Sequence, residues 1–167
     1  MKTEYSSRII PTRDGRFLAH YSAHGLAGLE FPGRQGSRRA AATPGGSLRA
    51  PIRRWHRATT RALQRVLAGR AAGSLPPLDL SAGTVFQQKV WNALRQIASG
   101  RTRSYSQIAR AIGRRKAVRA VGGACGANPV PVLVPCHRVL RSGGGLGGFS
   151  GGLKWKRLLL AREGVAI

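Results

Sequence analysis

Carboxylate side chains are scarce in this sequence of 167 residues, which has 5 Asp and Glu residues against 29 Lys and Arg. The acidic residues are Glu4, Asp14, Glu30, Asp79 and Glu163. Glycosidases with paired carboxylates, two-metal phosphoryl-transfer sites and calcium loops all require several acidic residues close together. The composition therefore argues against these classes of site.

Cysteine and long apolar runs are also limited. Cys125 and Cys136 are too few for a disulfide framework, although a single bridge between them is an alternative to a reactive thiol. Two Cys and four His residues show no zinc-ligand spacing, so we expect no metal site. No apolar run approaches the length of a membrane span, and residues 1–11 lack the apolar core of a secretory signal. We expect a cytoplasmic protein, free in the cytosol or associated with the nucleoid.

The net charge of +24 favours a polyanionic partner. Residues 1–75 carry +11 and residues 76–167 carry +13, so no basic tail is attached to a neutral body. A GC-rich coding sequence, which encodes much Arg, Ala and Gly, is an alternative source of part of this charge. The hydrophobic fraction of 42% predicts a folded chain, long enough for one domain or two small ones.

The N-terminal half is predicted to form strands and then one helix. Residues 16–22 and 26–31 are expected to be strands of a hairpin, and residues 32–51 a loop rich in Gly, Arg, Ser and Ala. Apolar residues at helical spacing follow, namely Ile52, Trp55, Leu63, Val66 and Leu67. Arginines on the other side of this helix are interpreted as a solvated face rather than a DNA contact: Arg53, Arg57, Arg61, Arg65 and Arg70. Residues 71–84 are predicted to link domains at 1–78 and 79–167.

The C-terminal half is predicted to be mainly helical. Thr84 can cap a helix ending at Gly100, and helices at 104–113 and 114–124 across a glycine turn are typical of a helix-turn-helix. Helical hairpins also occur in cores that never contact DNA. The last helix is expected over residues 153–162, with inward side chains at Leu153, Leu158 and Leu159.

Cys136 is the strongest candidate for chemistry, although a buried cysteine that acts as a small hydrophobe is the alternative. A thiolate is a nucleophile, and a neighbouring imidazole such as His137 can lower the pKa of a thiol. The segment at 129–135 is expected to be extended, because its prolines exclude a helix. Because adjacent side chains point in different directions, we expect a water or a special turn to connect the Cys136 thiol with the His137 imidazole. Glu163 ends a helix that must fold back over this region, which predicts a Cys-His-Glu relay. Residues 142–152 hold seven glycines and form a loop that a ligand can approach closely.

Several motifs, in one order, resemble those of the O6-alkylguanine-DNA alkyltransferases. They are Arg119-Ala-Val-Gly-Gly123, Asn128-Pro129, Pro135-Cys-His-Arg-Val139, Ser150-Gly-Gly152, Leu159-Leu160 and Glu163-Gly164. The resemblance covers residues 86–164 and implies an α+β protein. It implies an N-terminal ribonuclease-H-like sheet domain with a helix, then a mainly helical domain with a helix-turn-helix and an active-site loop. The N-terminal half resembles the family only in length and strand content.

The resemblance implies a suicide DNA repair protein. Members of this family flip O6-alkylguanine out of double-stranded DNA and transfer the alkyl group irreversibly to a cysteine, here Cys136. His137 is then a base that acts through a water, and Glu163 orients His137. O4-alkylthymine is a further expected substrate that the sequence does not establish. No cofactor and no membrane are implied, and the protein is expected to be a monomer, with cooperative assembly on DNA left open.

Further roles follow from the same resemblance. Asn128 holds the turn before the active-site segment, Tyr105 protonates the leaving guanine, and Arg119 fills the stack vacated by the flipped base. Small residues of the recognition helix allow close approach to the minor groove, namely Ala117, Ala120, Gly122, Gly123 and Ala124. The expected substrate pocket comprises Pro131, Val139, Phe149 and Ser150. Phe149 replaces a tyrosine that is frequent in the family, and Gly126-Ala127 leaves room for bulkier alkyl groups.

Two other classes of function stay open at this stage. One is a non-catalytic helix-turn-helix protein that binds damaged DNA and recruits repair factors, against which Cys136 argues. The other is a generic basic DNA-binding or regulatory protein, in which the Cys-His-Glu set is a coincidence. A regulator that senses methylated DNA would need a further domain with metal ligands.

Overall fold

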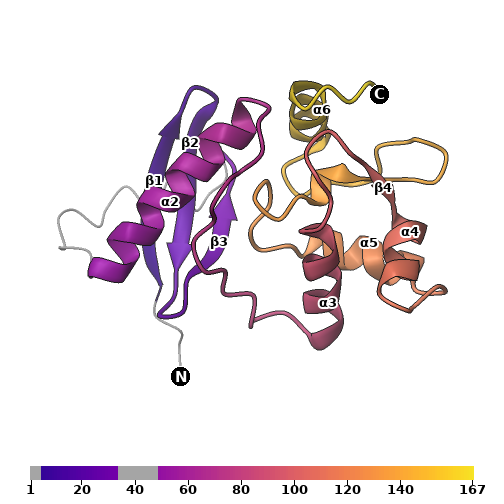
Figure 1. The fold of residues 1–167 in the computed structure, drawn as a ribbon, viewed down its shortest axis with the longest axis horizontal. Helices are drawn as coiled ribbons and strands as arrows, with labels where there is room; N and C mark the ends of the chain where they lie inside the picture. The colour runs from indigo at the N-terminus through magenta and orange to yellow at the C-terminus, as the bar shows by residue number, and fades with distance from the viewer. Residues whose placement is uncertain (1–4, 34–48) are drawn as a thin grey trace.

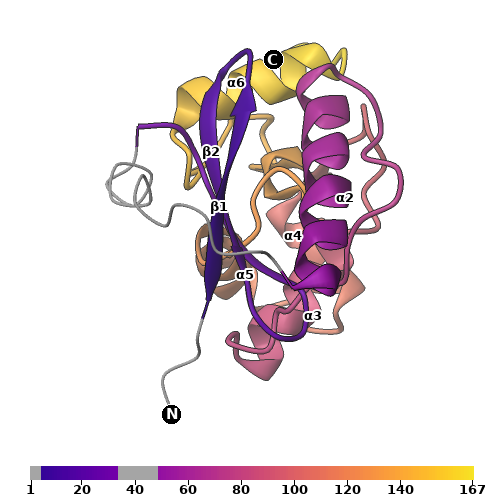
Figure 2. The same cartoon turned by 90° about the vertical axis from the view of Figure 1, so that its left-hand side faces the viewer.

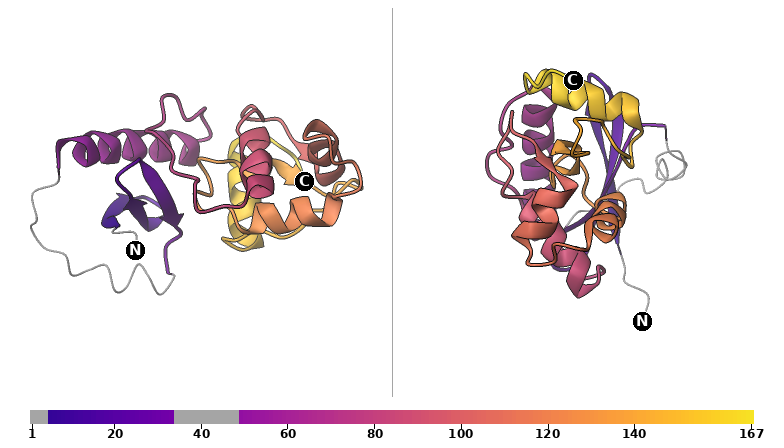
Figure 3. Two further views of the ribbon diagram at one scale, coloured as in Figure 1. Left: turned by 90° about the horizontal axis from the view of Figure 1, so that it is seen from below. Right: turned by 90° about the vertical axis from the view of Figure 1, so that its right-hand side faces the viewer.

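The computed structural model describes residues 5–33 and 49–167, so most of the predicted loop at 32–51 lies outside the described residues. The described chain forms a small antiparallel sheet and five helices, arranged as two lobes (Figure 1). The sheet and α2 make up one lobe, and the remaining helices make up the other. Figure 3 shows the two lobes side by side from below. No described helix is both long enough and apolar enough to span a bilayer.

The sheet of the first lobe consists of β1 (Ser6–Thr12), β2 (Gly15–Tyr21) and β3 (Leu26–Glu30), all antiparallel and in sequence order. The pairing of β2 with β3 confirms the predicted hairpin. Strand β1 was not predicted, because Pro11 and weak apolar alternation hide it; proline is tolerated here at the edge of the sheet. Phe17, Ala19 and Tyr21 alternate along β2 and are fully buried.

Helix α2 (Ala50–Leu67) lies along one face of this sheet (Figure 2). Pro51 occupies its first turn, where the missing amide donor costs nothing, so the helix begins inside the segment predicted to be a loop. Its buried residues are Thr59, Ala62, Leu63, Val66 and Leu67. The arginines of its other face are exposed, as the interpretation of a solvated face requires.

Residues 71–84 connect the lobes without forming a helix or strand, but they are not a free linker. The amide of Leu26 donates to the Pro77 carbonyl at 2.8 Å, and the amide of Asp79 donates to the Leu26 carbonyl at 2.9 Å. Ser22 Oγ also donates to the Asp79 carboxylate at 2.5 Å. The segment therefore packs along β3 as an added edge. A division into domains at residue 78 stays a prediction.

Helix α3 (Val85–Leu94), α4 (Tyr105–Ala111), α5 (Val118–Gly126) and α6 (Leu153–Arg162) build the second lobe. The short parallel pair β4 (Arg103–Ser104) and β5 (Val139–Leu140) lies among them. Helices α3 and α4 each begin with a reciprocal capping box, Thr84 with Gln87 and Ser104 with Gln107. These hydrogen bonds satisfy amides that a helix start leaves unpaired.

Two predicted helix boundaries are wrong. Helix α3 ends at Leu94 rather than Gly100. Ile97 lies in the turn after the helix and is buried, so the helical spacing of apolar residues continues past the end of the helix. Helix α5 begins at Val118 rather than at residue 114, since residues 114–116 form the turn between α4 and α5. The two helices still pack against each other across that turn (Figure 1).

The inward face of α6 also differs from the prediction. Leu159 is buried as expected, but Leu153 is 45% exposed, and Lys156 is buried in its place. The buried apolar residues of both lobes form one continuous cluster. Arg162, in the last turn of α6, donates two hydrogen bonds of 2.7 Å to the carboxylate of Asp14, in the β1–β2 turn. This bidentate ion pair joins the sheet to the helix that positions Glu163.

Replacing Asp14 by Asn tests this link between the lobes. Hydrogen bonds from Arg162 hold the pKa of Asp14 below its ordinary value of 3.8, so the pair contributes stability above that pH and loses it as the pH falls. We expect Asp14→Asn to lower the free energy of unfolding by about 1–3 kcal/mol at neutral pH. Urea unfolding at several pH values measures this, and an equal loss at neutral and strongly acidic pH would contradict the assignment.

Candidate active site

Asn128, just after α5, closes the turn that carries Cys136. Its side-chain oxygen accepts a hydrogen bond from the amide of Val130 at 3.0 Å. Its Nδ2 donates to the Val134 carbonyl at 2.8 Å and to Cys136 Sγ at 3.2 Å. The side-chain amide of Asn128 therefore connects both ends of the segment 130–134 with the sulfur of Cys136. This agrees with the turn-holding role expected for Asn128.

The segment at 129–135 is not extended throughout, although its prolines predicted a rigid extended segment. Pro131 and Val134 form an isolated bridge, and Val132 between them has a φ of +74°. That left-handed conformation is costly for a β-branched residue, and burial of the Val132 side chain helps to hold it. The chain then enters a 3₁₀ turn over Cys136–Arg138, which is the special turn expected between the adjacent thiol and imidazole.

Glu163 gathers three groups around one buried carboxylate. His137 Nε2 lies 3.0 Å from Oε1, and Arg138 donates from Nε and from its terminal nitrogen at 2.8–3.2 Å. The amide of Gly100 donates to Oε2 at 3.2 Å. Burial raises the pKa of Glu163, but hydrogen bonds from His137 and Arg138 outweigh it and lower the pKa to about 2. Glu163 is therefore ionised at neutral pH, and the structure brings the predicted His-Glu pair together.

The protonation state of His137 follows from this contact. Burial lowers the pKa of the imidazole below 6.5, so the ring is neutral at pH 7. Because the Glu163 carboxylate can only accept, Nε2 carries the ring proton and Nδ1 is left with a free lone pair. Nδ1 is buried and has no hydrogen-bond partner within the part of the chain that the structure describes. His137 is therefore oriented as a base.

The Cys136 thiol is 3% exposed and is held in its protonated form. Burial raises its pKa to about 11, against the hydrogen bond from Asn128 and the charge of Lys156. The lowered thiol pKa expected from a neighbouring imidazole is not found: among the described residues no hydrogen bond joins the Cys136 thiol to the His137 ring. Cys125 is also buried, and both cysteines are free, so the alternative of a disulfide is excluded in this structure.

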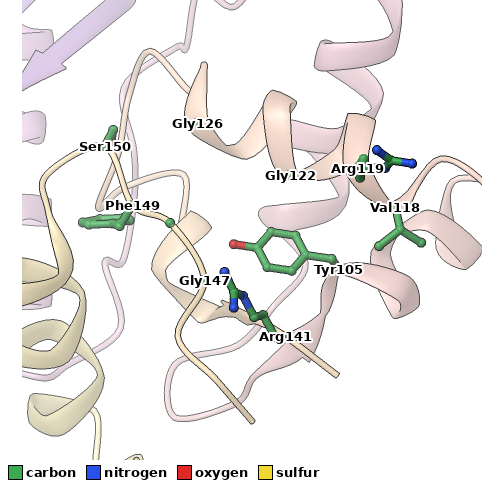
Figure 4. Close-up of a pocket in the computed structure, with 10 residues that line it drawn as sticks. Tyr105, Val118, Arg119, Gly122, Gly126, Arg141, Gly147, Phe149 and Ser150 are labelled. Atoms are coloured by element: carbon green, nitrogen blue, oxygen red, sulfur yellow. The ribbon is translucent and has the colours of Figure 1, made fainter. Parts of the chain in front are cut away.

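A cavity of about 530 Å³ opens between α4, α5 and the glycine-rich loop (Figure 4). Its lining comprises Tyr105, Val118, Arg119, Gly122, Gly126, Arg141, Gly147, Gly148, Phe149 and Ser150. Four predicted site residues besides Gly122 are among them, namely Tyr105, Arg119, Phe149 and Ser150. Cys136, Pro131 and Val139 are buried and do not line it. A reactant must therefore pass from this cavity into the protein interior to reach the sulfur.

Tyr105 and α5 form one side of the cavity. Burial, together with the two nearby cysteines, raises the pKa of Tyr105 above 10, so its hydroxyl is a proton donor at neutral pH. Arg119 is among the lining residues on α5, and its side chain extends away from the Tyr105 ring (Figure 4). Ala120 and Gly123 are exposed on the same helix. Ala124 was expected on this outer face, but it is buried, and its carbonyl accepts a hydrogen bond from Trp91 Nε1 at 2.8 Å.

Sequence reasoning missed Lys156, Arg138 and Arg141. The Lys156 ammonium is buried and donates to the carbonyls of Val139, Leu146 and Gly148, and so fastens the glycine-rich loop to β5. A lysine in helical register with the buried leucines of α6 was the available signal. Arg138 is the residue after His137 and pairs with the scarce acid Glu163. Arg141 extends beside the Tyr105 ring (Figure 4).

Residues 5–33 and 49–167 contain no cluster of three or more His, Cys, Asp or Glu side chains that could hold a metal ion. The reactive groups at this site are a thiol, an imidazole, a carboxylate and a phenol. Each of these groups is placed by the contacts described above.

Comparison with known proteins places this site in a family. The profile described as "6-O-methylguanine DNA methyltransferase, DNA binding domain" matches residues 85–165. The methylated-DNA-protein-cysteine methyltransferase of Methanosarcina acetivorans is 47% identical over 107 residues, which cover 62% of this chain and 69% of that protein. The chain belongs to the methylated-DNA-protein-cysteine methyltransferase family.

Other members of this family match to different extents. The inducible methyltransferase of Bacillus subtilis is 50% identical over 101 residues, 60% of this chain and 56% of that protein. A crystal structure of Mycobacterium tuberculosis OGT in complex with DNA has a TM-score of 0.75 and 37% identity, over 94% of this chain and 91% of that one. The chain spans between 24% and 61% of the length of the first three curated relatives it matches.

Replacing Glu163 by Gln tests the charge at the centre of the site. The carboxylate titrates at about 2 when folded against an ordinary 4.5, so its contribution is present above 4.5 and is lost as the pH falls toward 2. We expect Glu163→Gln to lower the free energy of unfolding by about 3–5 kcal/mol at pH 7, because Arg138 keeps a buried charge without its partner.

Urea unfolding between about pH 7 and pH 2 checks this, and the difference from wild type should shrink below 4.5. Glu30→Gln is a matched control, since the Glu30 side chain is 30% exposed and its contact with His20 is worth about 1 kcal/mol at most. A loss at Glu163 no larger than that at Glu30 would contradict the central role of this carboxylate.

Proposed function

We propose that this protein repairs O6-alkylguanine in double-stranded DNA by transferring the alkyl group to its own Cys136. The observation that carries the proposal is the buried set of Cys136, His137 and Glu163 beside a cavity that also holds Tyr105. Membership of the methylated-DNA-protein-cysteine methyltransferase family supports it. Each molecule acts once, because nothing in this set of groups reverses a thioether.

The chemistry balances without a cofactor. The proton of the Cys136 thiol passes through a water to His137 Nδ1, and Glu163 stabilises the imidazolium that forms. The thiolate attacks the alkyl carbon, a C–S bond forms, and the C–O bond breaks with its electron pair going to the guanine oxygen. Tyr105 donates a proton to the leaving guanine, solvent reprotonates Tyr105, and the His137 imidazolium releases the proton of the thiol to solvent. The products are unmodified guanine and S-alkylcysteine.

The DNA-binding part of the proposal rests on α4 and α5. They act as a helix-turn-helix, with the small exposed residues of α5 in the minor groove. Arg119 enters the stack when the damaged base leaves it, which offsets an unstacking cost of a few kcal/mol. The distributed charge of +24 supplies binding that does not depend on sequence. We also infer a ribonuclease-H-like N-terminal domain, a boundary at residue 78, a cytoplasmic location and a monomer; O4-alkylthymine is included as a second substrate.

A labelled substrate tests the proposal directly. Incubation with duplex DNA carrying O6-[³H]methylguanine should move label onto Cys136 until one equivalent per protein is bound. Cys136→Ala should abolish transfer, whereas Cys125→Ala, which removes the other buried thiol, should keep it. DNA binding without transfer would instead favour a non-catalytic damage-recognition protein.

Arg119→Ala separates base flipping from chemistry. We expect it to slow repair of duplex DNA at least about tenfold, because the vacated stack is no longer filled and unstacking costs a few kcal/mol. The rate of reaction with free O6-benzylguanine should change by less than about twofold. This substrate needs no flipping, and the role proposed for Arg119 is to fill the vacated stack of the DNA. Single-turnover rates measure both. Equal losses on the two substrates would remove Arg119 from the flipping step.

A further inference from the structure

Phe31, the residue after β3, contacts the wall of the candidate substrate cavity from the other lobe. Its ring centroid lies 5.6 Å from that of Phe149, with the rings nearly perpendicular at 71°. This edge-to-face arrangement is favourable for aromatic pairs. Phe31 is only 3% exposed, whereas Phe149 is partly exposed and lines the cavity. The sheet lobe therefore reaches the site through one side chain.

The position of Phe31 is fixed by two further rings. Phe17 of β2 lies 5.5 Å away and Trp155 of α6 lies 5.0 Å away, centroid to centroid. Phe17 and Trp155 also contact each other at 5.4 Å. Because aromatic side chains in a close-packed cluster have little freedom, the Phe31 ring offers Phe149 a rigid contact.

Phe31 and its strand meet both segments that form the site. A Cβ added at Gly151 would lie 2.6 Å from the Phe31 ring, so the loop backbone rests directly on that ring. On the same strand, the Leu29 amide donates to the Pro129 carbonyl at 2.9 Å. The end of β3 therefore sets the distance between the glycine-rich loop and the turn that carries Cys136.

Lys156 fastens the backbone of the Phe149 loop, but the direction of the Phe149 ring depends on the contacts of the ring itself. Residues 142–152 form no helix or strand and contain seven glycines. The centroid of the Phe149 ring also lies 6.3 Å from that of the His137 ring, at an interplanar angle of 80°. Phe149 therefore neighbours both Phe31 and the imidazole that we assign as the base.

We propose that Phe31 is a positioning residue that fixes the Phe149 ring and thereby sets which O6-alkyl groups the site accepts. This inference rests on the proposed function. Because the Phe149 ring lines the cavity, its fixed position restricts a bulky O6 substituent more than a methyl group. Selection between small and bulky adducts is accordingly shared by the sheet lobe, which contributes none of the reacting groups.

Phe31→Leu tests the inference through a ratio of rates. The smaller side chain lets the Phe149 ring move away from the cavity, so a methyl adduct loses contact and a benzyl adduct gains room. We expect the ratio of benzyl to methyl transfer rates, measured with O6-benzylguanine and O6-methylguanine in the same duplex, to rise at least about fivefold. A purely structural role would slow both transfers equally and leave this ratio unchanged.

Phe17→Leu is the matched control, because it makes the same change in the same cluster. Phe17 is fully buried and packs on Phe31 and Trp155, but among the described residues its ring makes no ring contact with Phe149. It should lower the melting temperature at least as much as Phe31→Leu. Because Trp155 and the Gly151 backbone still pack against the Phe31 ring in this variant, it should change the rate ratio by less than about twofold. Both variants are assayed well below their melting temperatures. If Phe31→Leu does not fold, Phe31→Met keeps more of the volume and serves the same test.

A double-mutant cycle shows whether the effect passes through Phe149. In a Phe149→Leu background, Phe31→Leu should have no further effect on the ratio, since the ring it positions is gone. An unchanged ratio in Phe31→Leu, or additive effects on the ratio in the double variant, would overturn the inference. Transfer to Cys136 by the wild type would still uphold the proposed function in that case. No transfer by the wild type from either adduct would overturn both.

Discussion

The Glu163 carboxylate is the point on which the rest of the site depends. It accepts hydrogen bonds from His137, Arg138 and the Gly100 amide, and so joins the end of α6 to the 3₁₀ turn and to the segment after α3. Its charge fixes which nitrogen of His137 is protonated and provides the counter-charge for a buried arginine. Neither the base nor the turn beside Cys136 would keep its geometry without it.

The scarcity of acidic residues made Glu163 predictable from the sequence. With Asp79 as the only other acid in residues 76–167, one carboxylate had to serve any histidine-based chemistry there. The capped start of α3 and the amphipathic pattern of α2 were predictable for a similar reason, because local hydrogen bonds and periodic burial leave direct marks on the sequence. Cys136 and His137 were identified from the motif around them, and the structure confirms that His137 meets Glu163.

Other features depend on contacts between distant segments and leave no such marks. The prolines at 129–135 excluded a helix, but they could not reveal that Val132 turns with a positive φ. The burial of Lys156 was not predicted, because a lysine is seldom buried, and only its three carbonyl partners explain its place in the core. The contact of Phe31 with Phe149 joins residues of different lobes, so no local pattern could predict it.

The clamp made by Lys156 has a consequence for how the site can diversify. Its ammonium binds main-chain carbonyls of the glycine-rich loop, and every amino acid presents such a carbonyl whatever its side chain is. Substitutions in the loop that keep the backbone path therefore leave the clamp intact while they change the surface facing a ligand. A single main-chain clamp can in this way support many side-chain linings, and substitutions in the loop can change the range of acceptable adducts without a change in the catalytic groups.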